Sequence, residues 1–285
     1  MSQEEKIALV TGCSSGIGLS TAIELAKEGY TTYGSMRNLE KKDALEEACK
    51  ENNVNVNIIQ LDVSSDESVS NAVEEIKEKH GRIDVLVNNA GHGFFGSVES
   101  TSIENFKSQF ETDFFGVIRT IQKILPVMRE QESGHIVNVS SVAGFMGFPV
   151  VSAYVSCKFA IEGLTESLRQ ELYEDDPNKK IHAISLEPGV VDTKFYENMT
   201  ILPESIPKYK KIIEALNAAA GEMFKNAMKP DKVAKKIISI LHEKEPEPRY
   251  RIGYDADQYW SDKKSTTPLE FEKIVREMLA DMTDL

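Results

Sequence analysis

The regular alternation of short apolar segments with amphipathic segments is the feature that most constrains the fold of this chain. Residues 7–10 are entirely apolar, which is typical of a strand buried on both faces, and a helical pattern over residues 17–28 follows directly. The same succession continues to residue 186. Because parallel strands must be joined by crossovers that are usually helical, this order predicts a doubly wound parallel sheet of the α/β class.

The alternation predicts a Rossmann-like sheet of about seven strands with helices on both faces. The expected strands are residues 7–10, 31–35, 57–61, 83–87, 135–139, 181–186 and 250–253. The expected helices are residues 17–28, 39–50, 65–80, 101–129 (one long helix or two consecutive ones), 154–173, 231–243 and 268–282. The sequence contains no repeat, low-complexity tract or linker, so we expect residues 1–285 to form a single domain.

The chain is acidic, with 33 basic and 46 acidic side chains and a formal net charge of −13 at pH 7. Such a chain repels polyanions, which argues against nucleic acid or an anionic membrane surface as a partner. No segment approaches the roughly 18–20 apolar residues of a membrane span, and the acidic N-terminus is unlike a signal peptide. Three cysteines make no disulfide framework and the five histidines show no ligand spacing, so we expect a cytoplasmic protein without a metal site.

A glycine-rich turn carries the first chemical signal. The segment from Thr11 to Gly18 directly follows the first predicted strand and opens the first predicted helix, with glycines at positions 12, 16 and 18. Glycines in this place allow a tight turn and let the backbone approach a pyrophosphate at a helix N-terminus. The motif alone also fits an ordinary turn between strand and helix, but its position favours dinucleotide binding.

With the spacing G-x-x-x-G-x-G in this turn, the sequence resembles the short-chain dehydrogenase/reductase family, in its single-domain branch. Further motifs of that family follow in the same order between residue 6 and about residue 195, and together they are specific although each is weak alone. They are Asp62 after the third strand, Asn88-Asn89-Ala90-Gly91 after the fourth, Ser141 after the fifth, Tyr154 and Lys158 as Y-x-x-x-K, and Pro188-Gly189 with Thr193 after the sixth. The stretches around Tyr154 and Arg37 look like the hydroxysteroid and retinol dehydrogenase subgroup.

Tyr154 and Lys158 are four residues apart and therefore share one face of a helix. A tyrosine with a pKa near ~10 is a poor base at neutral pH, so we expect the Lys158 cation to lower the pKa of Tyr154 and make it the general acid/base. Ser141 is expected to donate a hydrogen bond to the substrate oxygen, while the cofactor supplies the hydride. Each residue taken singly also has an ordinary structural explanation.

One residue departs from the family pattern. The resemblance implies an asparagine in the long central helix, within N-x-x-G, that holds a water in a proton relay to the lysine, but Asp113 stands at this position. An aspartate still accepts a hydrogen bond from that water, adds a charge and favours a protonated Lys158. We therefore expect catalysis to persist with an altered pH dependence. Asp113 is also the one feature that favours the alternative reading, a non-catalytic dinucleotide-binding scaffold or redox sensor that retains the fold.

The end of the second predicted strand indicates the cofactor. NAD-preferring members of the family place an acidic residue there for the ribose 2′-hydroxyl, whereas this chain has Met36 followed by Arg37, which can pair with a 2′-phosphate. We therefore expect NADP(H) to be preferred, with NAD(H) also possible. The resemblance implies a cofactor site made of Gly12, Ser14, Ser15, Gly16, Ile17, Gly18, Arg37, Asp62, Val63, Asn89, Ala90, Gly91, Tyr154, Lys158, Pro188, Gly189, Val191 and Thr193.

The segments expected around the nicotinamide end are apolar, which fits a small hydrophobic ketone, aldehyde or secondary alcohol as substrate, unless these side chains simply pack in the core. They contain Phe94, Phe95, Phe145, Met146, Phe148, Val150, Phe195, Tyr196, Met199, Ile201 and Leu202. His92 either faces the substrate or is an ordinary loop histidine. The resemblance further implies a carbonyl reductase or alcohol dehydrogenase, a substrate lid over residues 193–230 with residues 231–285 as a C-terminal extension, and a homodimer or homotetramer. The short C-terminal region counts against the extended branch of the family.

Overall fold

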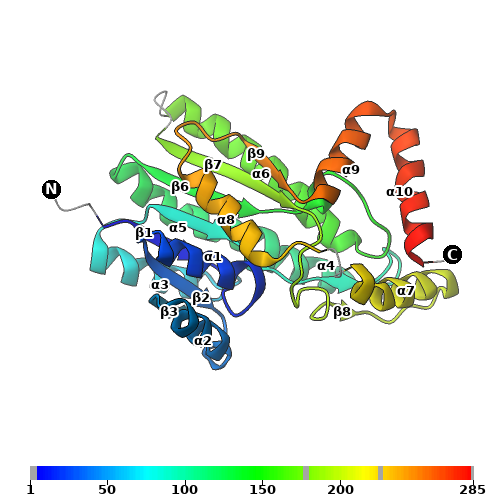
Figure 1. Ribbon diagram of the computed structural model, residues 1–285, viewed down its shortest axis with the longest axis horizontal. Helices are drawn as coiled ribbons and strands as arrows, with labels where there is room; N and C mark the ends of the chain where they lie inside the picture. Colours follow the sequence, from blue (N-terminus) through cyan, green and yellow to red (C-terminus); the bar gives the residue numbers. More distant parts are fainter. Residues whose placement is uncertain (1–4, 176–179, 224–226, 284–285) are drawn as a thin grey trace.

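Seven parallel strands form one sheet in the computed structural model, which describes residues 5–175, 180–223 and 227–283 (Figure 1). The strands are β1 (Ile7–Val10), β2 (Thr31–Met36), β3 (Val56–Gln60), β4 (Val85–Asn88), β6 (Gly134–Val139), β7 (Ile181–Pro188) and β9 (Arg249–Ile252). Their order across the sheet is β3-β2-β1-β4-β6-β7-β9. The predicted Rossmann-like doubly wound sheet is therefore confirmed, and each predicted strand lies within two residues of an observed one.

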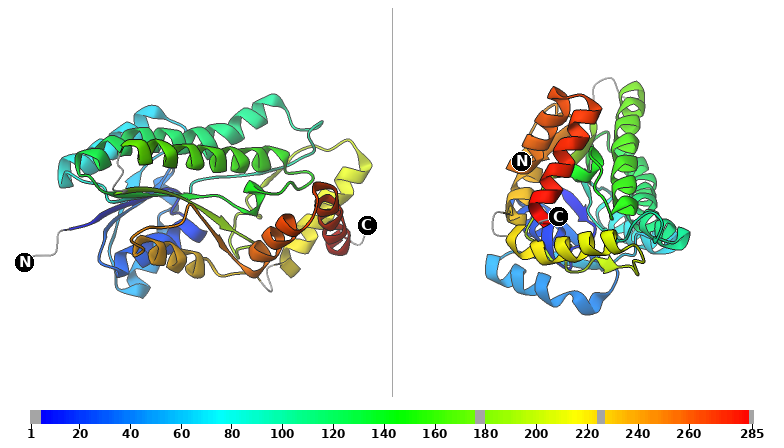
Figure 2. Two further views of the ribbon diagram at one scale, coloured as in Figure 1. Left: turned by 90° about the horizontal axis from the view of Figure 1, so that it is seen from above. Right: turned by 90° about the vertical axis from the view of Figure 1, so that its right-hand side faces the viewer.

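Two layers of helices cover the sheet, one on each face (Figure 2). The helices are α1 (Gly16–Lys27), α2 (Asp43–Asn52), α3 (Asp66–His80), α4 (Ile103–Phe110), α5 (Gly116–Glu130), α6 (Ser152–Asp175), α7 (Pro207–Met223), α8 (Pro230–Leu241), α9 (Tyr254–Ser265) and α10 (Pro268–Thr283). One hydrophobic core joins the sheet to α3, α5 and α6, and a second core joins it to α1, α2 and α8. Because both faces are covered, β1 is fully buried along its length, as its apolar sequence predicts.

The helix boundaries follow ordinary capping chemistry. The hydroxyl of Ser65 accepts a hydrogen bond from the backbone N–H of Ser68 at 3.2 Å and so begins α3. The same helix ends at Gly81, whose φ of +71° is the left-handed conformation that glycine adopts without strain. None of the described helices combines the length and the apolar character needed to cross a membrane.

The segment predicted as one long or two consecutive helices is interrupted by a π-helical turn. The turn covers Glu111–Phe115 and joins α4 to α5 without a loop, and Asp113 lies at its centre. A π turn holds one residue more than an α turn, and such turns are frequent at functional sites. Asp113 is buried within this turn, and only 1% of its surface is exposed.

Several elements beyond the predicted strands and helices gather beyond the carboxyl edge of the sheet (Figure 1). A small parallel sheet forms between β5 (Phe94–Phe95) and β8 (Thr200–Ile201), so that the segment after β7 is hydrogen-bonded to the loop after β4. Helix α10 packs against both α7 and α9 at the same end of the molecule. Helix α9 carries a weak apolar pattern with only Ala256 buried, which explains why the sequence did not predict it.

Candidate active site

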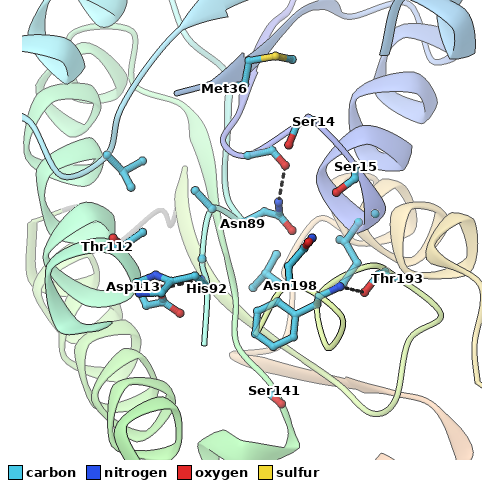
Figure 3. A pocket seen from close by; sticks show the side chains of 18 of the residues that line it. Ser14, Ser15, Met36, Asn89, His92, Thr112, Asp113, Ser141, Thr193 and Asn198 are labelled. Carbon is cyan, nitrogen blue, oxygen red and sulfur yellow. Dashed lines mark hydrogen bonds and ion pairs between the residues drawn. The ribbon is translucent and has the colours of Figure 1, made fainter. Parts of the chain in front are cut away.

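A cavity of about 490 Å³ opens at the carboxyl edge of the sheet, where β1, β2, β4, β6 and β7 end (Figure 3). Strand order runs in opposite directions from β1 and β4, so the cavity lies at the topological switch point where open α/β sheets bind ligands. Every predicted catalytic and cofactor-binding residue except Gly18 lines this cavity. Side chains that are far apart in the sequence are thus brought to a single place by the fold.

The glycine-rich turn is built so that backbone can approach a ligand closely. Gly12 and Gly16 have φ values of +75° and +60°, and a Cβ on Gly12 would lie 2.8 Å from the Cα of Ala90. A Cβ on Gly18 would lie 2.3 Å from the carbonyl oxygen of Gly12, so Gly18 allows close packing of the turn rather than contact with the cavity. The first turn of α1 has no acidic residue, which leaves its N–H groups suited to an anion.

The motif after β4 fixes this turn in place. The Thr11 hydroxyl accepts hydrogen bonds from the backbone N–H groups of Asn89 and Ala90 at 2.9 and 3.0 Å. In return, the Asn89 side-chain amide donates to the carbonyl oxygens of Thr11 and Gly12 at 2.9 and 3.2 Å. Asn89 therefore supports the turn as well as lining the cavity.

Cationic side chains line the cavity wall next to β2. Arg37 lines this wall beside the uncharged Met36, as predicted. The second cation, Lys41, comes from the turn that follows. Sequence patterns had not singled out Lys41, because a lysine four residues beyond Arg37 has no spacing signal of its own. At the end of the neighbouring strand β3, Asp62 is held by Ser64, whose hydroxyl donates to the carboxylate at 2.6 Å.

The three residues predicted to carry the chemistry meet at the other end of the cavity. The Ser141 hydroxyl accepts a hydrogen bond from the backbone N–H of Ala143 at 3.1 Å. The Lys158 Nζ lies 5.4 Å from the ring centroid of Tyr154 and donates a hydrogen bond to the carbonyl oxygen of Val139 at 2.8 Å. Lys158 is buried, with 7% of its surface exposed, so its ammonium group is held in a defined position.

The electrostatics of this group differ from the sequence-based expectation. Burial raises the pKa of Tyr154, the charge of Asp113 raises it further, and a hydrogen bond from Ser141 offsets only part of the rise. Burial also lowers the pKa of Lys158, although Asp113 opposes that shift. The expected lowering of the Tyr154 pKa is therefore wrong for this structure, because desolvation of the phenolate has the largest effect on it.

Few of the predicted apolar residues reach the cavity. Phe195 and Tyr196 line it, and the Phe195 ring lies 5.4 Å from that of Tyr154. The others belong mainly to two hydrophobic clusters, one under α9 and α10 and one under α7, as the alternative interpretation had allowed. Ser108, Thr112 and Asn198 line the cavity without having been predicted, since polar residues at these places carry no sequence signal.

Comparison with known proteins agrees with this geometry. The family model described as short chain dehydrogenase matches residues 6–201. Retinol dehydrogenase 8 of Bos taurus is 37% identical over 265 residues, which cover 89% of this chain and 83% of the relative. A 3-ketodihydrosphingosine reductase of Bacteroides thetaiotaomicron is 33% identical, with 93% of this chain and 94% of the relative covered.

Solved structures give the same result. A short-chain dehydrogenase from Streptomyces avermitilis superimposes with a TM-score of 0.81 and 31% identity, covering 97% of this chain and 99% of that structure. An alcohol dehydrogenase from Thermococcus sibiricus, complexed with 5-hydroxy-NADP, has a TM-score of 0.70 and 28% identity, covering 87% of this chain and 96% of that structure. Similarity thus extends over nearly the whole chain, including the segments beyond residue 201.

Proposed function

This chain belongs to the short chain dehydrogenase family, and from that premise we propose that it is an NADP(H)-dependent oxidoreductase acting on a hydrophobic ketone, aldehyde or secondary alcohol. The observation that carries the proposal is the convergence of Ser141, Tyr154 and Lys158 on one cavity with the glycine-rich turn. The residues present fit a dinucleotide, because the first turn of α1 is free of acidic side chains and Gly12, with a φ of +75°, lines the cavity without a side chain.

NADPH supplies a hydride when bound, and the side chains of this chain handle the oxygen and the proton. In the proposed reduction, the Ser141 hydroxyl donates a hydrogen bond to the substrate carbonyl oxygen and holds it in place. Tyr154 Oη gives its proton to that oxygen as the alcohol forms, which leaves a phenolate beside the Lys158 ammonium. Lys158 stabilises this phenolate until a proton from solvent restores Tyr154.

The raised pKa of Tyr154 keeps the side chain in the protonated form that a proton donor needs. Burial and Asp113 keep the phenol protonated through the neutral range, which is the form that carbonyl reduction needs. Alcohol oxidation needs the phenolate instead. We therefore expect the rate of oxidation to rise with pH above neutrality, while the rate of reduction falls only at alkaline pH.

The decisive test is the variant Tyr154→Phe, assayed by NADPH oxidation with a panel of hydrophobic ketones and aldehydes. The variant loses the proton donor but keeps the ring that packs on Phe195. We expect kcat to fall at least ~100-fold, the lower end of what a positioned general acid contributes, with NADPH affinity changed less than a few-fold. Two outcomes would contradict this proposal: a parent that binds NADPH but reduces no member of the panel, or a variant as active as the parent. Either outcome would favour the alternative, a non-catalytic dinucleotide-binding scaffold or redox sensor.

We further propose that Arg37 and Lys41 set the preference for NADP(H) over NAD(H). Both line the cavity where the 2′-phosphate would lie, and Met36, not an acidic residue, stands at the end of β2. Replacing both by alanine should reduce kcat/KM with NADPH by roughly 10- to 100-fold, as expected for one or two lost charge-assisted contacts, and change kcat/KM with NADH little. The matched control is Lys42→Ala, whose ammonium group pairs with Glu46 at 2.8 Å. An unchanged ratio of the two cofactors would disprove this assignment.

We also propose that residues 193–230 close over the cavity as a substrate lid, with residues 231–285 as a C-terminal extension of the same domain; of these, residues 224–226 and 284–285 lie outside the described ones. The names of two relatives, a retinol dehydrogenase and a 3-ketodihydrosphingosine reductase, support a hydrophobic substrate. The pairing of β8 with β5, which places Phe195 against Tyr154, supports the lid. The homodimer or homotetramer and the cytoplasmic location stay predictions.

A further inference from the structure

Asp113 is a buried carboxylate with one oxygen that receives no hydrogen bond from the described residues. Its Oδ1 accepts a hydrogen bond from the backbone N–H of His92 at 3.1 Å. Its Oδ2 has no donor among them and lies over Gly91, where a Cβ would be 2.9 Å away. A carboxylate in such a place is costly unless cationic groups face it.

Two groups that can carry positive charge interact with Asp113. Lys158 does so from α6, where burial lowers its pKa and the charge of Asp113 opposes that shift. The imidazole of His92 acts from the loop after β4, with Nδ1 3.4 Å from Asp113 Oδ1. Asp113 also raises the pKa of Tyr154, so its field reaches both reactive side chains of α6.

His92 is held between this buried carboxylate and the open cavity. Its ring packs edge-on against Phe94 at 5.1 Å, and its carbonyl oxygen accepts a hydrogen bond from Gln109 Nε2 at 2.7 Å. The side chain is 33% exposed and lines the cavity beside Asp113 (Figure 3). The ring can therefore exchange a proton with solvent while it stays in contact with the carboxylate, and imidazole is the side chain that ordinarily changes charge near neutral pH.

We propose that His92 is a positioning residue for the reduction, whose imidazole compensates the charge of Asp113 in a pH-dependent way and so tunes Tyr154 and Lys158. This rests on the proposed function. A protonated His92 forms an ion pair with Asp113, which weakens the field at Tyr154 and makes its phenol a better proton donor. A neutral His92 leaves the full field of Asp113, which holds Tyr154 protonated and favours the Lys158 cation.

The other charged and titratable groups near the pair do not replace His92 in this role. On α6, Tyr154, Cys157 and Lys158 interact electrostatically with Asp113. Glu162, on the same helix, interacts with Lys158. Burial raises the pKa of the Cys157 thiol. Burial lowers the pKa of the Lys158 ammonium group from its ordinary value, which lies well above neutrality. Glu111, two residues from Asp113, is turned away and forms an ion pair with Arg119.

The first test is the pH dependence of kcat/KM for NADPH-dependent reduction, compared between the parent and His92→Gln. We expect the parent to show an inflection in the neutral range, with a rate roughly 2- to 5-fold higher on the acidic side, and the variant to lack it. The matched control is His242→Gln, which removes an imidazole 3.3 Å from a surface carboxylate, that of Glu28, and should keep the inflection. An inflection that survives in His92→Gln overturns the proposal.

A second variant, Asp113→Asn, separates the field of the carboxylate from the proton on His92. It should lose the same inflection and also move the alkaline limb of the profile to lower pH by about one unit, because Asp113 no longer raises the pKa of Tyr154. His92→Gln should leave the alkaline limb in place, because Asp113 still acts on Tyr154 in that variant. Equal alkaline limbs in Asp113→Asn and the parent would overturn the coupling.

The third test needs no activity and so stands apart from the proposed function. Thermal unfolding of the parent, His92→Gln, Asp113→Asn and the double variant forms a double-mutant cycle at pH 5.5 and at pH 8.5. We expect the Tm changes to be non-additive by about 2–4 °C at pH 5.5 and additive at pH 8.5. Tm changes that are additive at both pH values would disprove the interaction between His92 and Asp113. If the parent is inactive but the Tm changes are non-additive at pH 5.5, only the proposed function is disproved.

Discussion

At the scale of single residues, the most unusual group outside the cavity is Glu187, near the end of β7. Its side chain is 1% exposed and shares its surroundings with Glu162, which is also buried. Arg251 forms an ion pair with Glu187 at 3.2 Å, and Arg249 forms one with Glu162 at 2.8 Å. Burial and the charge of Glu162 raise the pKa of Glu187 to about 7, because two adjacent carboxylates resist being charged together.

We predict that this carboxyl makes the protein less stable as the pH rises. A raised pKa means that folded Glu187 keeps a proton between its unfolded value of 4.5 and about 7, where the unfolded chain has lost it. The stabilisation is therefore complete below pH 4.5 and is lost as the pH rises through 7. Glu187→Gln should remove about 1–3 kcal/mol of the decline in unfolding free energy between pH 5 and pH 8.5.

Urea unfolding at the two pH values measures this effect. The matched control is Glu166→Gln, because Glu166 is 67% exposed and pairs with the same Arg249 at 3.0 Å. Its pH dependence should equal that of the parent. A decline of the same size in Glu187→Gln and in the parent would show that Glu187 is not the responsible group.

At the scale of elements, the pairing of β5 with β8 ties the proposed lid to the loop after β4. Glu204 reinforces this pairing, since its carboxylate accepts hydrogen bonds from the Ser100 hydroxyl at 2.8 Å and from the backbone N–H groups of Ser97 and Ile206. These donors lower the pKa of Glu204 to about 2. The contribution is lost only as the pH falls through that value, so the connection is fully formed at neutral pH.

Glu204→Gln should loosen the lid for two reasons. The amide oxygen is a weaker acceptor than the carboxylate, and the amide N–H₂ group would face groups that themselves donate hydrogen bonds. We expect the KM for a hydrophobic substrate to rise roughly 3- to 10-fold, as for a weakened charge-assisted hydrogen bond, with little change in NADPH affinity. Glu197→Gln, an exposed acidic residue on the same segment, is the control and should behave as the parent. Parallel losses of substrate and NADPH binding would argue against a lid and for general destabilisation.

The sequence predicted the strands and most helices because their apolar periodicity reflects burial, as in the fully buried β1. It could not predict the π turn at Glu111–Phe115, since one extra residue in a helix leaves the local composition unchanged. Two-residue strands such as β5 and β8 are too short to show a period of two. At the site, motifs located the reacting groups, but Lys41 and the environment of Tyr154 depend on three-dimensional proximity.

At the scale of the whole molecule, the last third of the chain is joined to the wall of the cavity. Strand β9 extends the main sheet beside β7, and Arg251 stacks over Trp260 at 4.5 Å, which holds α9 against that strand. The Asp255 carboxylate accepts a hydrogen bond from the backbone N–H of Val190 at 2.6 Å. A Cβ on Gly189 would lie 2.0 Å from the same carboxylate. The start of α9 can therefore pack against the chain after β7 only because residue 189 has no side chain.

Gly189→Ala should therefore act through Asp255 rather than only locally. We expect Tm to fall and the Kd for NADPH to rise by roughly 10-fold or more, since overpacking against a fixed carboxylate costs on the order of 1–3 kcal/mol. Adding Asp255→Ser shortens the obstructing side chain and should recover part of both losses, measured by thermal unfolding and NADPH fluorescence. The single variant Asp255→Ser is the control, and strictly additive losses in the double variant would contradict the contact.

The π turn between α4 and α5 has a consequence for how this protein can change over time. Because a π turn holds one residue more than an α turn, deleting one residue from Glu111–Phe115 would leave an α turn and one continuous helix from α4 to α5. Val117, Ile121 and Ile124 would keep their places in the core, whereas the bulge that carries Asp113 would be lost. A change of length at this turn would therefore alter the wall of the cavity and spare the core.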